Sequence, residues 1–85
     1  MALKEDFERA SREVTQLSKR PDNETLLALY SLYKQATEGD AKGQRPGLLD
    51  VKGRKKFDSW AERKGLPADK AMEQYVALVR QLQTA

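Results

Sequence analysis

The chain has 85 residues, of which 39% are hydrophobic and 34% charged, and its net charge at pH 7 is +3. This length allows one domain, residues 1–85, and the composition is too apolar for a disordered chain. Cysteine and histidine are both absent, which excludes disulfides and thiolate metal sites and removes the commonest general base and metal ligand. We therefore expect neither an enzyme nor a metal-binding protein.

The positive charge is concentrated in one part of the chain. Residues 41–64 have a local charge of +5, and the remaining residues sum to −2. An anionic partner is therefore expected to meet the third quarter of the chain. The N-terminal residues lack the hydrophobic segment of a signal peptide, and no apolar run approaches the ~20 residues of a membrane span. We expect a soluble, cytoplasmic protein.

Two helices are expected in the first half of the chain. Apolar residues at three- and four-residue spacing predict the first helix over residues 4–18. Pro21 breaks the pattern, and Asp22 or Asn23 can cap a second helix over residues 23–37. The second helix is apolar around nearly its whole circumference. Either it is the central helix, packed on several sides, or part of its surface faces a ligand.

The second half of that helix carries a polar aromatic wedge. Tyr30, Tyr33 and Lys34 fall within roughly 100° of one another on a helix of about 3.6 residues per turn. The rings can stack on a flat base and the ammonium can meet a phosphate. The alternative is that both tyrosines are half-buried core residues with solvated hydroxyls.

A glycine-rich loop over residues 39–49 is expected to follow, longer than the usual helix connection of about 2–8 residues. It is either functional or a spacer that lets distant helices cross.

Asp50 is expected to cap a third helix that runs to about Lys64 and ends at Gly65. Pro67 suits the first turn of a fourth helix, whose apolar stripe continues to the C-terminus. The architecture predicted is a four-helix bundle.

The lysines of the third helix leave two interpretations open. Lys52, Lys55 and Lys56 form either an ordinary solvated face or a phosphate-binding surface, because they border the aromatic residues Phe57 and Trp60.

With the elements in this order, the chain resembles the acyl-CoA-binding protein family from Phe7 to Leu82. The resemblance is carried by Tyr30–Asp40 (YSLYKQATEGD), Arg45–Asp50 (RPGLLD), Lys52–Trp60 (KGRKKFDSW), Lys64–Gly65 and Ala71–Tyr75 (AMEQY). It implies an all-α, up-down-down-up four-helix bundle with a long loop between helices 2 and 3. It also implies that the protein sequesters and transports medium- to long-chain fatty acyl-CoA without changing it, and needs no cofactor.

The resemblance assigns roles by position. Tyr30 and Tyr33 would hold the adenine and adjacent groups of CoA, Lys34 and Lys56 would bind its phosphates, chiefly the 3′-phosphate, and Tyr75 would close the site.

Four further positions complete the expected site or depart from the family. Lys52 occupies a position where the family also has a lysine, and Leu27 supplies apolar surface for the acyl groove. Thr15 stands where many members have a ligand-facing lysine. Phe57 replaces the usual tryptophan and keeps an aromatic wall without the indole N–H.

The partners expected are fatty acyl-CoA and, transiently, acyl-CoA-using enzymes and membrane surfaces; nucleic acid is not expected, and the protein is expected to be a monomer. The alternatives are a helical protein-interaction module, built on the leucine-rich second helix, or a nucleic-acid-binding module that uses the lysines and aromatic residues.

Overall fold

The structure, a computed structural model, describes residues 2–84. These residues form α1 (Leu3–Glu13), a single 3₁₀ turn η1 (Val14–Gln16), α2 (Asn23–Glu38), α3 (Val51–Ala61) and α4 (Ala68–Gln83), and they contain no β-strand. The predicted all-α class and the four helices are confirmed, and residues 39–50 connect α2 to α3 without regular secondary structure.

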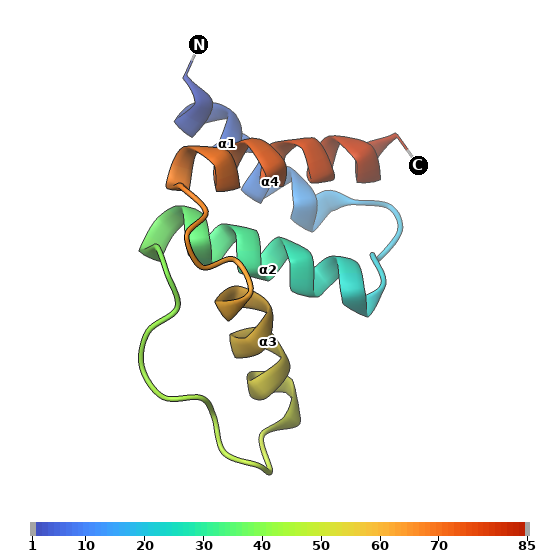
Figure 1. Cartoon of the computed structure of the whole chain (residues 1–85). Coiled ribbons are helices and arrows are strands. Elements are labelled where there is room, and N and C mark those ends of the chain that lie inside the picture. The colour runs from blue at the N-terminus through green and yellow to red at the C-terminus, as the bar shows by residue number, and fades with distance from the viewer. Residues whose placement is uncertain (1, 85) are drawn as a thin grey trace.

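The helices are arranged around α2. In Figure 1, α1 and α4 run in the same direction, α2 runs opposite to them, and α3 crosses α2 at a steep angle. The helix α2 packs against both α3 and α4, and α1 packs on α4. The Cα atoms extend over 39 × 28 × 15 Å, so the molecule is a flat plate. The apolar circumference of α2 therefore reflects its central position.

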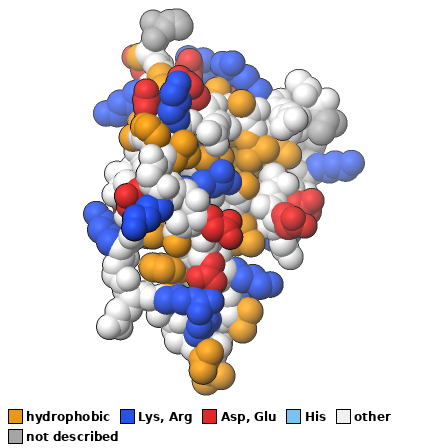
Figure 2. Space-filling model, in the orientation of Figure 1, with side chains coloured by type: hydrophobic (Ala, Val, Ile, Leu, Met, Phe, Trp, Pro, Cys, Tyr) orange, Lys and Arg blue, Asp and Glu red, His pale blue; other side chains and the backbone are white. Residues whose placement is uncertain are grey.

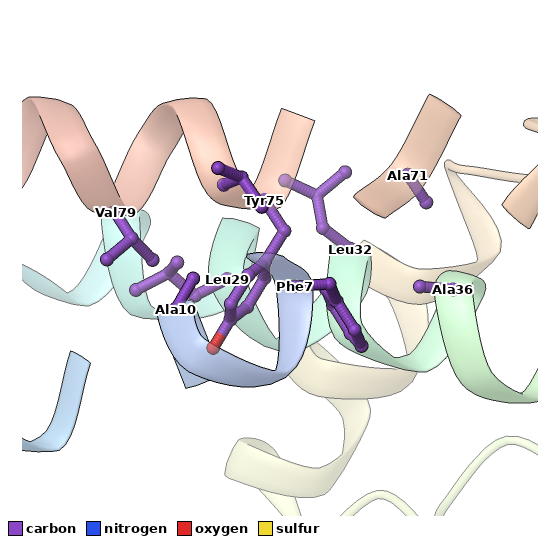
Figure 3. Close-up of a cluster of buried hydrophobic side chains, with 9 residues drawn as sticks. Phe7, Ala10, Leu29, Leu32, Ala36, Ala71, Tyr75 and Val79 are labelled. Carbon is purple, nitrogen blue, oxygen red and sulfur yellow. The ribbon is translucent and has the colours of Figure 1, made fainter. Parts of the chain in front are cut away.

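The core lies between α1, α2 and α4. Its buried residues are Phe7, Ala10, Leu29, Leu32, Ala36, Ala71, Tyr75, Val76 and Val79. In Figure 3, side chains from the three helices converge in this cluster. The spacing of these residues places them on one face of each helix. Full burial of a Leu, Val or Phe side chain contributes about 1.5–3 kcal/mol to folding.

Two helices end earlier than the sequence predicts. The α-helical part of α1 stops at Glu13, because β-branched Val14 and Thr15 favour a helix only weakly and the Thr15 hydroxyl donates to the carbonyl of Arg12 (2.7 Å). The helix α3 stops at Ala61. Its last turn then tightens, with the Lys64 N–H donating to the carbonyl of Ala61 (3.2 Å).

A polar junction ties the end of α2 to the α3–α4 connection. The Gln35 amide donates to the Asp40 carboxylate (2.8 Å) and to the carbonyl of Leu66 (3.0 Å). The N–H of Gly65 donates to the same Asp40 oxygen (2.8 Å). Gly65 has φ +88°, as expected of a residue that ends a helix in the left-handed region. The Gly65 N–H first, and then the Gln35 amide, lower the pKa of Asp40.

The long connection between α2 and α3 is braced at its far end. The Arg45 guanidinium donates to both carboxylate oxygens of Asp58 on α3 (2.9 and 2.7 Å). Asp50 caps α3 by accepting from the N–H of Gly53 (3.0 Å). A Cβ at position 53 would displace the Asp50 carboxylate, so glycine allows this close approach of the cap. Within residues 2–84, no helix is long and apolar enough to cross a membrane.

Candidate ligand-binding site

The wedge predicted on α2 lies between two other elements. Tyr33 stands at the edge that faces α1 and α4, and Lys34 stands at the edge that faces α3. Tyr30 lies between them in the helical projection. One helix therefore presents two rings and a cation to neighbours on both sides.

An aromatic cluster covers the first of these edges. The ring of Tyr33 stacks on Phe7 with centroids 5.3 Å apart and planes inclined by 28°. Tyr75 meets Phe7 edge to face at 5.1 Å and lies 6.0 Å from Tyr33. Tyr33 is 41% exposed, whereas Tyr75 is only 4% exposed. Tyr33 therefore offers ring surface to a ligand, and Tyr75 supports it from the core.

Burial also affects the Tyr75 hydroxyl. Desolvation, and secondarily the neighbouring Tyr33, raise the pKa of Tyr75 above its usual value. The hydroxyl is therefore protonated at neutral pH and can donate a hydrogen bond.

A second group joins α2 to α3. The Lys56 ammonium of α3 lies 5.5 Å from the centroid of the Tyr30 ring. Tyr30 is partly exposed and Lys56 is exposed. A cation at this distance from an aromatic face is attracted by the ring quadrupole, worth about 0.5–1 kcal/mol at an exposed position. A phosphorylated aromatic ligand offers both partners a replacement, because its base can stack on the ring and its phosphate can bind the ammonium.

Lys34 is held by two partners. Its ammonium donates to the Glu38 carboxylate one turn further along α2 and lies 4.9 Å from the centroid of the Trp60 ring. The hydrogen bond to Glu38 raises the pKa of Lys34, and desolvation opposes it. The ammonium is thus charged at neutral pH, and a ligand phosphate has to compete with a carboxylate for it.

Three predicted residues remain, Leu27, Lys52 and Thr15. Leu27 is partly buried one turn before Tyr30, and its carbonyl accepts a hydrogen bond from Ser59 of α3 (3.3 Å). Lys52 is exposed one turn before Lys56 on the same side of α3. Thr15 is exposed in η1, where its hydroxyl is occupied by Arg12. In the part of the chain that the structure describes, Lys52 and Thr15 make no ion pair or aromatic contact with the cluster.

Three further residues contact the cluster. Phe7 belongs to the core, and no sequence signal indicates that it also stacks on Tyr33. Trp60 donates its indole N–H to the Gly39 carbonyl (2.8 Å), and its ring lies beside Lys34. Glu38 is the last residue of α2, and its i,i+4 spacing from Lys34 is a sequence signal for their ion pair. Phe57 packs against Trp60 at 6.4 Å, an aromatic pair at the expected position of the wall.

A separate hollow of about 460 Å³ lies between the α1–α2 connection and the end of α4. Leu17, Arg20 and Leu82 are among the residues that line it, and none of the predicted ligand residues does so. The described residues contain no group of three or more His, Cys, Asp or Glu side chains that could hold a metal ion.

The fold and the cluster define a small helical domain with cations and aromatic rings at the junction of α2 with its neighbours. A family model described as acyl-CoA-binding protein matches residues 4–79. The acyl-CoA-binding protein of Brassica napus is 48% identical over 82 residues, which cover 96% of this chain and 89% of that protein. A homologue from Manduca sexta is 46% identical over 83 residues, covering 96% of this chain and 92% of its own.

Solved structures agree with this match. The crystal structure of acyl-CoA-binding protein 2 of Oryza sativa superimposes with a TM-score of 0.93 at 38% identity, over 98% of this chain and 92% of that one. The chain belongs to the acyl-CoA-binding protein family. The bundle type that its sequence resembles is thereby confirmed.

Proposed function

We propose that this protein binds medium- to long-chain fatty acyl-CoA thioesters, sequesters them and carries them without chemical change. One observation supports this function above the others: Tyr30, Tyr33, Lys34 and Lys56 lie together at the α2 junctions, in a chain that matches the family over nearly its whole length. This combination suits a ligand that is both aromatic and phosphorylated.

In the proposed complex the CoA head group takes over contacts that the free protein makes internally. The adenine stacks on the exposed faces of Tyr30 and Tyr33, which contributes about 1–3 kcal/mol by comparison with base stacking on other proteins. Lys56 leaves the Tyr30 ring and Lys34 leaves Glu38 to bind phosphate oxygens, chiefly those of the 3′-phosphate. Each charge-assisted hydrogen bond contributes about 1.5–3 kcal/mol.

Other residues are proposed to contact the head group and the acyl chain of the ligand. Tyr75, buried beneath Tyr33, closes the site with its protonated hydroxyl, and Lys52 adds a second cation on α3. Leu27 forms part of the wall of the acyl groove. Burial of each methylene contributes about 0.8 kcal/mol, so the acyl chain supplies most of the affinity. Thr15 carries no charge, and the first helix therefore contributes less to phosphate binding here than a lysine would.

The proposal extends to the mode of action. Residues 1–85 act as a single binding domain, a monomer that takes one ligand and has no catalytic role. It acts in the cytoplasm, with acyl-CoA-using enzymes and membrane surfaces as transient partners. The chain offers neither histidine nor cysteine as a base or nucleophile for hydrolysis of the thioester. No comparison supports the protein-interaction or nucleic-acid-binding alternative.

Calorimetric titration with CoA esters of increasing chain length tests this function. Affinity should rise by about tenfold for every two methylenes until the groove is filled. Free CoA and free palmitate should each bind orders of magnitude more weakly than palmitoyl-CoA, and free CoA should not accumulate during a long incubation. Equal affinity for palmitate and palmitoyl-CoA would exclude the head-group mechanism, and released CoA above a protein-free control would contradict the non-catalytic role.

A further inference from the structure

Three aliphatic side chains, at the end of the α2–α3 connection and at the first residue of α3, are largely exposed among the residues that the structure describes. Leu48 is 80% exposed, Leu49 99% and Val51 57%. The N–H of Asp50 donates to the carbonyl of Gly47 (3.0 Å), which places both leucines at the central positions of a tight turn. Singly exposed aliphatic residues are common on protein surfaces, whereas a contiguous exposed apolar patch is typical of an interaction surface. We call Leu48, Leu49 and Val51 the aliphatic tip.

The aliphatic tip is held in place from both sides. Behind it, Asp50 caps α3 through the N–H of Gly53. Before it, the two hydrogen bonds from Arg45 to Asp58 fix the connection to the flank of α3. The leucines therefore project from a braced turn, and little conformational freedom remains to be lost when they are buried by a partner.

Positive charge surrounds the aliphatic tip. Residues 42–56 contain six lysines and arginines and a single acidic residue, Asp50, whose carboxylate already accepts the cap hydrogen bond. In Figure 2, hydrophobic side chains gather at the lower end of the molecule, with Lys and Arg side chains beside them. This end corresponds in Figure 1 to the point where the connection meets α3.

We propose that the aliphatic tip inserts into the interface of a membrane that contains anionic lipids. Apolar side chains that enter the acyl boundary, combined with lysines that meet anionic headgroups, are the two contributions that hold peripheral proteins on bilayers. The tip is convex and its leucines project from a turn, which suits a bilayer better than the groove or flat face of a protein interface. The positive surroundings match the negative surface potential of such a membrane.

Docking by the aliphatic tip would place the candidate ligand site close to the bilayer, as a carrier that delivers acyl-CoA requires. The docking proposal rests on the proposed function only for this biological purpose. Lys52 follows Val51 directly, and Lys56 lies one turn further along α3 beside Tyr30. A protein docked by the tip therefore holds the ligand site within two turns of α3 from the bilayer, so an acyl chain that leaves its groove has a short path to an apolar phase.

Vesicle flotation of the ligand-free protein tests docking separately from acyl-CoA binding. The wild type should float with phosphatidylcholine vesicles that contain about 30% phosphatidylserine, and much less with pure phosphatidylcholine. The double variant Leu48→Ser/Leu49→Ser should bind the anionic vesicles about tenfold more weakly. Its affinity for palmitoyl-CoA in solution should equal that of the wild type. The matched control, Ala77→Ser/Gln81→Ser on the exposed side of α4, should float like the wild type.

Two further measurements separate insertion from charge attraction. Because the chain has no cysteine, Leu49→Cys can be labelled at one site with an environment-sensitive fluorophore. Its emission should shift to the blue on anionic vesicles, and the same label at Gln81→Cys should not respond. Lys55→Glu should weaken flotation at about 0.1 M salt, where the Debye length is about 10 Å, and Lys4→Glu at the start of α1 should not.

Three outcomes would overturn the proposal. The wild type could float no better with anionic than with neutral vesicles. The double serine variant could float as well as the wild type. A concentration-dependent dimer in sedimentation experiments, abolished by the same double variant, would show that the tip is covered by a second copy of the chain.

Discussion

At the residue scale, the three tyrosines of the candidate site differ in burial although they share a side chain. Tyr75 is almost fully buried against Phe7, Tyr33 is 41% exposed, and Tyr30 lies partly exposed beside Lys56. The sequence predicts that all three are candidate ligand residues, but it cannot grade their burial, because that depends on side chains contributed by α1 and α3.

This difference predicts opposite effects of two alanine substitutions. Tyr75→Ala should lower the free energy of unfolding by about 3–5 kcal/mol, as large aromatic-to-alanine changes in cores do. Tyr30→Ala should leave most of the stability intact and cost about 1–3 kcal/mol of palmitoyl-CoA binding through lost stacking. Denaturant unfolding and calorimetry on both variants provide the two measurements.

A phenylalanine variant serves as the control for Tyr30→Ala. Tyr30→Phe keeps the ring and should bind nearly as the wild type does. If Tyr30→Ala unfolded as early as Tyr75→Ala and its folded fraction bound normally, Tyr30 would be a packing residue and not part of the site.

The ion pair between Lys34 and Glu38 leads to a second prediction at this scale. Glu38 holds the ammonium that the ligand phosphate is proposed to bind, and its own negative charge repels that phosphate. Lys34→Met should weaken palmitoyl-CoA binding by about ten- to a hundredfold, the cost of one charge-assisted contact. Glu38→Gln should strengthen it by about two- to fivefold, since a partly exposed ion pair contributes at most about 1 kcal/mol.

Titration with the CoA ester and with its dephospho form, which lacks the 3′-phosphate, checks both variants. The effect of Lys34→Met should shrink for the dephospho ester. Weaker binding by Glu38→Gln would instead mean that Glu38 orients Lys34 for the ligand.

At the scale of the elements, the sequence predicts the existence and order of the helices better than their ends. The caps at Asp22 and Asp50 are local signals, and the structure contains both. Gly65 has the positive φ expected of a terminator, but the α-helical part of α3 already ends at Ala61. The early end of α1 results from a competing hydrogen bond of Thr15, which periodicity does not reveal. Helix ends are decided by single polar contacts, whereas helix positions are decided by the summed burial of a stripe.

Contacts between different helices and loops are also harder to predict from the sequence than the helices themselves. The wedge of Tyr30, Tyr33 and Lys34 follows from helix geometry alone, so the sequence predicts it correctly. Phe7 lies far from Tyr33 in the sequence, and the brace from Arg45 to Asp58 spans a loop of no regular structure. Such contacts depend on how the helices cross, and a single sequence carries no direct signal for them.

At the scale of the whole molecule, three aspartates join or cap separate parts of the fold. In each case a hydrogen bond is the main cause of a lowered pKa. The donors are Thr25 to Asp22, Gly65 to Asp40 and Arg45 to Asp58. A carboxylate whose folded-state pKa is lowered stabilises the fold above its unfolded-state pKa, near 4, and loses this contribution as the pH falls through the folded-state value. The chain has no histidine to titrate between about pH 5 and 8.

We therefore expect the unfolding midpoint to change little from about pH 8 to pH 5 and to fall steeply below about pH 4. Thermal unfolding by circular dichroism across this range measures it. Asp40→Asn keeps an acceptor oxygen for Gly65 but cannot titrate, so its midpoint should fall less between pH 5 and pH 3. A midpoint that falls as steeply as in the wild type would show that Asp40 does not contribute to acid sensitivity.

The flat shape of the molecule has a kinetic consequence. The Cα atoms span only 15 Å along the shortest axis, which corresponds to two packed helix layers with axes about 8–10 Å apart. The side chains of α1, α2 and α4 already fill the space between these layers, so cargo bound along α2 as proposed would keep one flank open to its surroundings. Loading and unloading would then need no lid to open, and the strength of the contacts, rather than a gating motion, would set the residence time of the cargo.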